Sequence, residues 1–207
     1  SIVTYIEANN LRDIRLVGHS YGGMVISGVA DRLTDRIRRL VYVNAFVPLD
    51  GQCLNDMVPP HYVGLFDAVA ATNKGAVMLP FEIWRDAFIN DADLELAKSA
   101  FAKLNLHPYK TFTDKITLKH ALAELPVGKS YVNCRQDIAL PQGGEVMVQA
   151  HDRLGAIAGE ARGTPGQPFA LGPFSVEFVA VTHSIPEPTA LMIRTALGNV
   201  FHSGDWK

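Results

Sequence analysis

The stretch RLVGHSYGGMV, residues 15–25, joins an apolar run to a glycine-flanked serine and then to a helical pattern. Residues 14–18 (IRLVG) are mostly branched and apolar, which is typical of a strand buried on both faces of a sheet. Residues 21–33 (YGGMVISGVADRL) are long enough for a helix, and their small side chains allow close packing on that sheet. Between them, residues 18–22 (GHSYG) fit the G-x-S-x-G pattern of a nucleophile elbow, a sharp turn that exposes a serine hydroxyl.

The elbow pattern assigns a role to each of its residues. Ser20 is the candidate nucleophile, and the backbone N–H of Tyr21 is a candidate oxyanion donor beside the helix N-terminus. Because the turn is sharp, we expect side chains in place of Gly18 or Gly22 to collide with neighbouring elements. His19 is expected to face the sheet or the oxyanion side, which makes it a candidate substrate contact and a poor general base.

The order of the elements predicts a parallel sheet. A second buried-strand pattern, residues 38–48 (RRLVYVNAFVP), follows the helix, and strand–helix–strand order predicts a right-handed parallel crossover. Residues 129–137 (KSYVNCRQD) predict a third parallel strand, and residues 144–154 (GEVMVQAHDRL) a helix after it. Asp137 ends the third strand. Since the carboxyl ends of parallel strands border one crevice, Asp137 is a candidate partner of Ser20.

A helical insertion separates the second and third predicted strands. Residues 49–80 read as loop, with a Pro-Pro pair and several glycines. Residues 80–88 (PFEIWRDAF) and 91–104 (DADLELAKSAFAKL) predict two helices. We therefore expect residues 49–125 to form a lid over one edge of the sheet.

Aromatic side chains of this lid suggest an apolar pocket. Phe81 and Trp84 are candidate substrate contacts for an apolar acyl or alcohol group. Aromatic residues at helical spacing also pack commonly in a core, and this alternative stays open.

The texture of the sequence changes near residue 155. Residues 155–164 are rich in Gly and Ala and predict a linker between a body at residues 1–154 and a tail at residues 165–207. The tail shows partial alternation, and residues 189–207 read as a hairpin that turns at Gly198-Asn199. The tail is thus expected to be a β-rich, antiparallel segment.

The body resembles a known family. Residues 16–52, 106–116 (LHPYKTFTDKI) and 131–141 (YVNCRQDIALP) are similar to the α/β-hydrolase superfamily, in the branch of plant hydroxynitrile lyases, methyl-ester hydrolases and their bacterial relatives. The resemblance implies an α/β fold, a partial α/β-hydrolase parallel sheet with a helical lid. It also implies that Asp137 is the catalytic acid.

The same resemblance implies early strands and an oxyanion loop for which no counterpart precedes Ser1. The strand that carries the elbow is therefore expected to have an open edge. An unpaired apolar edge is a template for pairing, so we expect a homo-oligomer that pairs it. The hairpin of the tail and a separate fragment are the alternative partners of this edge.

A triad needs an imidazole, and His183 is the best candidate. It lies just past an apolar strand pattern in VEFVAVTHSIPEPTAL, residues 176–191, and the family's histidine follows its last strand in a similar phrase. The spacing from Asp137 is longer than is usual in this branch. The predicted roles are nucleophile for Ser20, proton carrier for His183, and orientation of the imidazole for Asp137.

A rival resemblance covers the same tail. Residues 171–207 are similar to a segment of ribonuclease J-like proteins of the metallo-β-lactamase fold, in which His183 and Asp205 would be zinc ligands. That family also uses an H-x-H-x-D-H cluster, which this sequence lacks. Because two ligands cannot fill a tetrahedral zinc site, we expect neither a metal nor a cofactor.

Composition narrows the setting. The 207 residues are 48% hydrophobic and 19% charged with a formal net charge of -2, an ordinary globular composition without a basic footprint for nucleic acid. No apolar run is long enough for a membrane helix, and no secretory pattern opens the chain. Cys53 and Cys134 lie far apart in the sequence without the spacing of a metal site, so we expect no disulfide framework. We expect a cytoplasmic protein without a membrane partner.

The sequence thus predicts a serine hydrolase that cleaves small carboxylic esters, with weak activity. One alternative is a catalytically inactive truncated or fusion chain. Another is hydroxynitrile-lyase-like chemistry on the same triad, which asks for a lysine near the pocket, with Lys110 and Lys129 as candidates.

Overall fold

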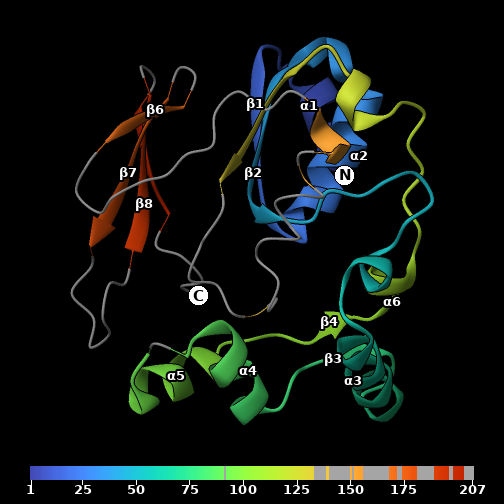
Figure 1. The fold of residues 1–207 in the computed structure, drawn as a ribbon, viewed down its shortest axis with the longest axis vertical. Coiled ribbons are helices and arrows are strands. Elements are labelled where there is room, and N and C mark those ends of the chain that lie inside the picture. Colours follow the sequence, from blue (N-terminus) through green and yellow to red (C-terminus); the bar gives the residue numbers. More distant parts are fainter. Residues whose placement is uncertain are drawn as a thin grey trace. The chain divides into compact units, whose positions relative to one another are not determined.

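The structure is a computed structural model (Figure 1). It describes residues 1–90, 92–132, 139, 150, 152–155, 168–171, 174–180, 189–195 and 198–202. The chain divides into two compact units, residues 1–68 with 108–160 and residues 69–107 with 161–207. The predicted linker falls largely outside the described residues, so the division into body, linker and tail stays a prediction.

The first unit is built on a parallel sheet. Strands β1 (Ile14–Ser20), β2 (Ile37–Ala45) and β5 (Gly128–Val132) lie in the order β1-β2-β5, and both neighbouring pairs are parallel. Helix α2 (Gly22–Arg32) connects β1 to β2 and contacts both strands. The predicted strand–helix–strand crossover is confirmed. Residues 133–138, the end of the predicted third strand, lie outside the described residues.

Helix α1 (Ile2–Ala8) packs on α2 beside the sheet (Figure 1). It begins where the Ser1 hydroxyl accepts a hydrogen bond from the Thr4 backbone N–H at 3.2 Å, an ordinary N-cap. A small apolar cluster joins these helices to the sheet; its buried members are Ile6, Val29 and Leu33, and Val3, Ile14, Leu16 and Val25 pack against it.

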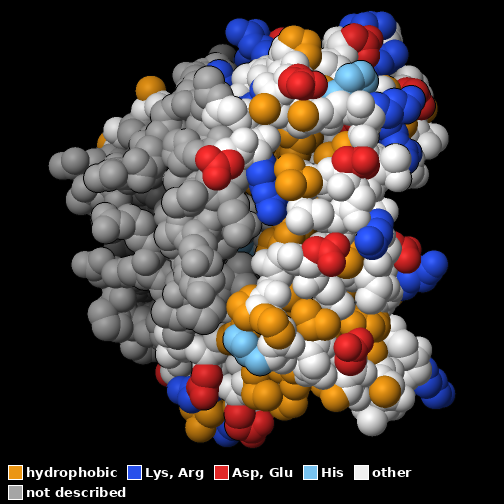
Figure 2. Space-filling view, turned by 45° about the vertical axis from the view of Figure 1, so that its right-hand side comes forward, with side chains coloured by type: hydrophobic (Ala, Val, Ile, Leu, Met, Phe, Trp, Pro, Cys, Tyr) orange, Lys and Arg blue, Asp and Glu red, His pale blue; other side chains and the backbone are white. Residues whose placement is uncertain are grey.

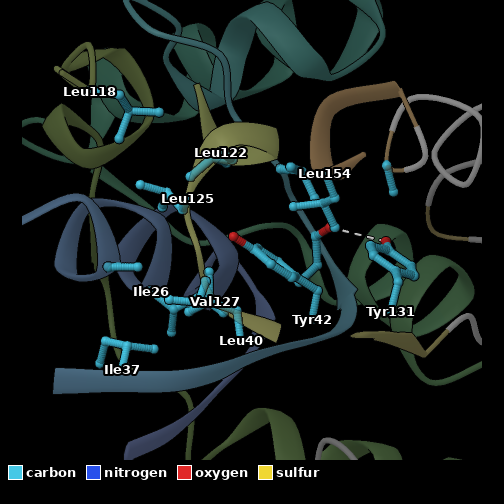
Figure 3. Packing of buried hydrophobic residues seen from close by; sticks show 14 residues of the cluster. Ile26, Ile37, Leu40, Tyr42, Leu118, Leu122, Leu125, Val127, Tyr131 and Leu154 are labelled. Atoms are coloured by element: carbon cyan, nitrogen blue, oxygen red, sulfur yellow. Dashed lines mark hydrogen bonds between the residues drawn. The ribbon is translucent and has the colours of Figure 1, made fainter. Parts of the chain in front are cut away.

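The main core lies around the middle strand (Figure 3). It contains Ile26, Ala30, Ile37, Leu40, Tyr42, Ala45, Val47, Leu118, Leu122, Leu125, Val127, Tyr131, Ala150 and Leu154. The rings of Tyr42 and Tyr131 stack with centroids 6.4 Å apart, and the Tyr131 hydroxyl donates to the Ala45 carbonyl at 3.0 Å. These contacts join β5 to β2 near Ala45, the residue that pairs with Ser20.

The 3₁₀ turn η1 (Thr34–Arg36) lies between α2 and β2. The elements that follow β2 before β5 are the 3₁₀ turns η2 (Leu54–Met57) and η3 (Leu122–Glu124), the helices α3 (Pro60–Thr72), α4 (Phe81–Phe88), α5 (Leu94–Phe101) and α6 (Lys110–Thr113), and the paired strands β3 (Ala76–Val77) and β4 (His107–Pro108). Helices α4 and α5 confirm the two helices predicted in this region, and the lid over the sheet stays a prediction. The prediction of loop over residues 49–80 is wrong, because α3 occupies part of it. Pro60 opens that helix, at a position whose N–H needs no partner.

The second unit contains an antiparallel sheet. Its strands β6 (Phe169–Leu171), β7 (Phe174–Ala180), β8 (Thr189–Thr195) and β9 (Gly198–His202) lie in sequence order. The predicted hairpin is present, but its predicted turn is wrong. Thr195 pairs with Gly198, so Gly198 begins β9 instead of forming the turn.

On the face drawn in Figure 2, basic and acidic side chains are interspersed. This mixed surface fits the small net charge of the chain. Among the helices that the structure describes, none has the length and apolar character needed to cross a membrane.

Candidate active site

Ser20 sits at the junction of β1 and α2 with a strained backbone. Its φ angle is +50°, in the left-handed region that residues with a side chain rarely adopt. Such a conformation costs on the order of 1–3 kcal/mol and persists only where neighbouring structure enforces it. The Ser20 side chain is half-buried, so it is not packed away in the core. This is the backbone that a nucleophile elbow requires.

Two glycines allow the turn. A Cβ atom on Gly18 would lie 2.6 Å from the carbonyl oxygen of Gly22, and one on Gly23 would lie 2.0 Å from the carbonyl oxygen of Phe46. The expectation for Gly18 is met. The expectation for Gly22 is wrong, because a Cβ atom there would meet no atom within 4 Å. Sequence reasoning missed Gly23, although the doubled glycine at the helix start was a visible signal for it.

Backbone pairing holds the serine in place. The register between β1 and β2 shifts between His19 and Ser20, so that His19 pairs with Val43 and Ser20 with Ala45. The Ser20 carbonyl then accepts a hydrogen bond from the Phe46 backbone N–H at 3.1 Å. The C-terminal end of β2 therefore contacts the elbow directly, through strand pairing and this hydrogen bond.

Tyr21 is the N-cap residue of α2 and has helical backbone angles. Its backbone N–H therefore belongs to the first turn of the helix, where the helix dipole favours negative charge. Its side chain is half-buried, and its hydroxyl donates to the Thr111 carbonyl at 3.1 Å. Burial raises the pKa of the Tyr21 hydroxyl, so it stays protonated at neutral pH.

The acid and the base of the predicted triad are outside the described residues. Asp137 and His183 both fall there, and so does Asp205 of the rival zinc reading. The register nevertheless shows where β5 leads: Val132, its last residue, pairs with Val43, which pairs with His19. The chain thus leaves β5 level with the residue before Ser20, at the same end of the sheet.

The other predicted site residues lie on three elements. His19 is the penultimate residue of β1 and is half-buried. Phe81 and Trp84 lie on α4 in the second unit, where their ring centroids are 5.3 Å and 5.4 Å from that of Phe101 on α5. Both residues are half-buried. Their roles as substrate contacts, like that of His19, stay predictions.

Both candidate lysines of the lyase alternative lie among the described residues. Lys129 is buried near the start of β5, and its ammonium group donates to the carbonyls of Ala123 and Leu125 at 3.1 Å and 2.8 Å. Burial lowers its pKa. It pairs with Leu40, well before the end of the sheet where Ser20 lies. Lys110 forms an exposed ion pair with Asp114 at 3.5 Å.

Comparison with known proteins assigns most of the chain to one family. The family model for the alpha/beta hydrolase family matches residues 2–191. A carbendazim hydrolyzing esterase from Nocardioides sp. (strain SG-4G) is 47% identical over 83 residues, 36% of this chain and 34% of that protein. The alpha/beta hydrolase nvfD of Aspergillus novofumigatus is 28% identical over 140 residues, 63% of this chain and 54% of that protein. The chain therefore spans between a third and about half of these relatives' length.

Solved structures agree. An extracellular alpha/beta-hydrolase from a Paenibacillus species, described as a structural and functional homologue of tobacco salicylic acid binding protein 2, superposes with a TM-score of 0.70. It is 34% identical, over 77% of this chain and 68% of that one. A methylesterase from Arabidopsis shares the fold, with a TM-score of 0.53 and 16% identity over 74% of this chain and 61% of that one.

A short segment matches elsewhere. Over 42 residues, 20% of this chain, the sequence is 67% identical to ribonuclease J of Sinorhizobium meliloti, of which the match covers 7%. The resemblance to ribonuclease J is thereby confirmed as a similarity of sequence.

Proposed function

Because the chain belongs to the alpha/beta hydrolase family, we propose that it is a serine hydrolase that cleaves carboxylic esters. The observation that carries the proposal is the left-handed backbone of Ser20, enforced by close backbone contacts at the start of a helix. The ester as substrate class is supported by the similarity to an esterase that is 47% identical over the matched segment.

The proposed reaction has two halves. The Ser20 hydroxyl attacks the ester carbonyl while His183 takes its proton, and Asp137 holds the imidazole in the reactive tautomer. The negative charge on the former carbonyl oxygen is stabilised by the Tyr21 N–H and by the N-terminus of α2. The C–O bond then breaks, and the alkoxide leaves with the proton from His183. Water, deprotonated by His183, hydrolyses the acyl-enzyme and releases the acid.

The assignment of the acid rests on topology. Asp137 follows β5, whose last described residue is level with His19, and the order Ser, Asp, His along the chain is that of the fold. His183 is assigned as the base from its position after a predicted strand. Among the described residues we assign one oxyanion donor, Tyr21, and on that basis we propose weak activity, since removal of one donor from an oxyanion hole costs about 10²- to 10³-fold in kcat.

The proposal is tested with chromogenic acetate and butyrate esters. We expect Ser20→Ala to abolish hydrolysis and to prevent labelling by an active-site phosphonate, while the exposed Ser99→Ala on α5 serves as the matched control and keeps both. Asp137→Asn and His183→Ala should each lower kcat by orders of magnitude. Equal rates of ester hydrolysis for the wild type and Ser20→Ala would refute the proposed hydrolase activity and support the alternative of a catalytically inactive chain. Cyanide release from a cyanohydrin that depends on Ser20, without ester hydrolysis, would favour the lyase.

We also propose that a second copy of the chain pairs with β1. In the described sheet β1 is the outer strand, and Val17 on it is 48% exposed. An apolar outer strand favours pairing with another strand. Light scattering is expected to show a dimer, and Val17→Lys is expected to weaken it; a wild-type monomer would refute this. The cytoplasmic location stays a prediction, since the 34%-identical relative is an extracellular protein.

A further inference from the structure

The side chain of Tyr21 contacts helix α6. Its backbone stands next to Ser20, but its hydroxyl donates to the carbonyl of Thr111 on α6. Its ring also contacts that of Phe112, with centroids 6.5 Å apart and planes tilted by 44°. One residue therefore joins the elbow to a lid helix that is distant in sequence.

From Phe112 the contacts continue into α3. The centroid of Phe112 lies 5.0 Å from that of Phe66, which is buried, and Phe66 stacks on Tyr62 at 5.8 Å. The Tyr62 hydroxyl in turn donates to the carbonyl of Ala139 at 2.7 Å. Edge-to-face and offset aromatic contacts have preferred geometries, so a chain of them transmits position as well as burying area.

A polar contact fixes the same cluster from its outer side. Tyr109, directly before α6, packs edge-on against Phe112 with centroids 6.0 Å apart. Its hydroxyl donates to the carboxylate of Asp67 on α3 and accepts from the side-chain amide of Asn55 on η2, the latter at 2.8 Å. Helix α6 is thus held to η2 and α3 on one side and to the elbow, through Tyr21, on the other.

We infer that Tyr21 is a positioning residue, whose side chain couples the lid elements α3 and α6 to the backbone N–H that receives the oxyanion. The inference rests on the proposed function and extends it. An oxyanion donor must be held within about 0.5 Å of its productive place. The backbone of Tyr21 is set on one side by Ser20 and Gly22, and its side chain is set by Thr111 and Phe112. A shift of α6 therefore reaches the donor through the Tyr21 side chain.

The first test compares Tyr21→Phe, which keeps the ring and removes the hydrogen bond, with Tyr42→Phe as the matched control. Tyr42 also makes one hydroxyl hydrogen bond, to Ser27 in the core. Rates are divided by the amount of Ser20 that a phosphonate titrates, which removes the effect of misfolded protein. For Tyr21→Phe we expect kcat to fall about 2- to 12-fold with KM little changed, the range for one neutral hydrogen bond. Tyr42→Phe should keep the wild-type kcat. Equal kcat values per titrated serine for Tyr21→Phe and the wild type would overturn the inference.

The second test does not depend on activity. Amide hydrogen exchange is measured over residues 109–113 in the wild type and both variants. Tyr21→Phe should speed exchange in this segment, while Tyr42→Phe should leave it at the wild-type rate. If the wild type hydrolyses no ester, the proposed function fails, and the coupling is still judged here. Unchanged exchange in Tyr21→Phe would overturn the coupling whether or not the protein is a hydrolase.

Discussion

Gly23 and Phe46 meet backbone to backbone, so closely that a Cβ atom on Gly23 would lie 2.0 Å from the Phe46 carbonyl oxygen. The backbone N–H of Phe46 also donates a hydrogen bond to the Ser20 carbonyl at 3.1 Å. The residue that excludes a side chain at Gly23 is therefore the residue that holds the strained serine. Because a backbone atom cannot swing aside as a long side chain can, this contact limits what position 23 accepts.

Alanine at this position should be costly. We expect Gly23→Ala to lower the free energy of unfolding by at least about 1–3 kcal/mol, the usual cost of overpacking, and to reduce phosphonate labelling of Ser20. Gly22→Ala is the matched control. A Cβ atom there meets nothing within 4 Å, and alanine favours a helix, so urea unfolding should show no loss and up to about 1 kcal/mol of gain. Equal destabilisation by the two variants would contradict the contact.

The buried hydroxyls of Ser27 and Tyr42 should respond unequally to deletion. Ser27 donates to the Gly23 carbonyl at 2.7 Å, so the Tyr42 hydroxyl, 2.9 Å away, is the donor to Ser27. Tyr42→Phe leaves the Ser27 proton bound and should cost about 1 kcal/mol. Ser27→Ala leaves a buried hydroxyl without its acceptor and should cost about 1–3 kcal/mol. The double variant, compared by urea unfolding, should fall short of the sum; an additive result would exclude the coupling.

Stability should fall in acid because of Asp31. Burial raises the pKa of this carboxyl, but hydrogen bonds from the backbone N–H groups of Lys119 and His120 and from the His120 ring outweigh burial, so the pKa lies below its ordinary value. A carboxyl with a lowered pKa stabilises the fold above its unfolded pKa of about 4, and this stabilisation is lost as the pH falls through the folded pKa.

Thermal unfolding from pH 7 to pH 2 tests this. Asp31→Asn should be less stable at pH 7 and show a flatter dependence on pH below about 4. His120→Ala keeps both backbone hydrogen bonds and should retain most of the wild-type dependence. A wild-type slope in Asp31→Asn would assign the acid sensitivity to other groups.

Lys129 should matter for stability and not for catalysis. Lys129→Met leaves the carbonyls of Ala123 and Leu125 without the ammonium donor, which should cost about 1–3 kcal/mol. Lys129 is level with Leu16 through Leu40, four residues before Ser20 and about 13 Å along the strand. Ester hydrolysis per titrated serine should therefore stay at the wild-type level. A fall of tenfold or more would return Lys129 to the site.

The sheet around Ser20 was predictable from local patterns. The apolar runs in β1 and β2 and the small residues of α2 follow rules of spacing that need no knowledge of distant contacts. Helix α3 was not, because Pro59-Pro60 and Gly64 read as breakers, yet proline at the first helical position breaks no hydrogen bond. The turn at Gly198 was misplaced because glycine marks turns by frequency, while strand pairing decided the register.

In the candidate active site, too, features set by local sequence were predictable and features set by distant contacts were not. Ser20 and the N-cap position of Tyr21 follow from the motif, since strand, turn and helix are contiguous. The roles of Gly23 and of the Tyr21 hydroxyl depend on Phe46 and Thr111, which lie on other elements. Composition and spacing carry no information on such contacts. The error at Gly22 has the same origin, because a motif records which residue recurs and not which atom stands opposite.

Among the described residues, the close contacts around Ser20 fall between Gly18 and Phe46, a single consecutive stretch of the chain. Closing short loops loses less chain entropy than closing long ones, and folding is faster where partners are near in sequence. The kinked serine can therefore form early during refolding, ahead of the long loop that must close to bring Thr111 to Tyr21. Because the strain has a local origin, residues 14–46 grafted onto another parallel sheet should keep the left-handed backbone of Ser20.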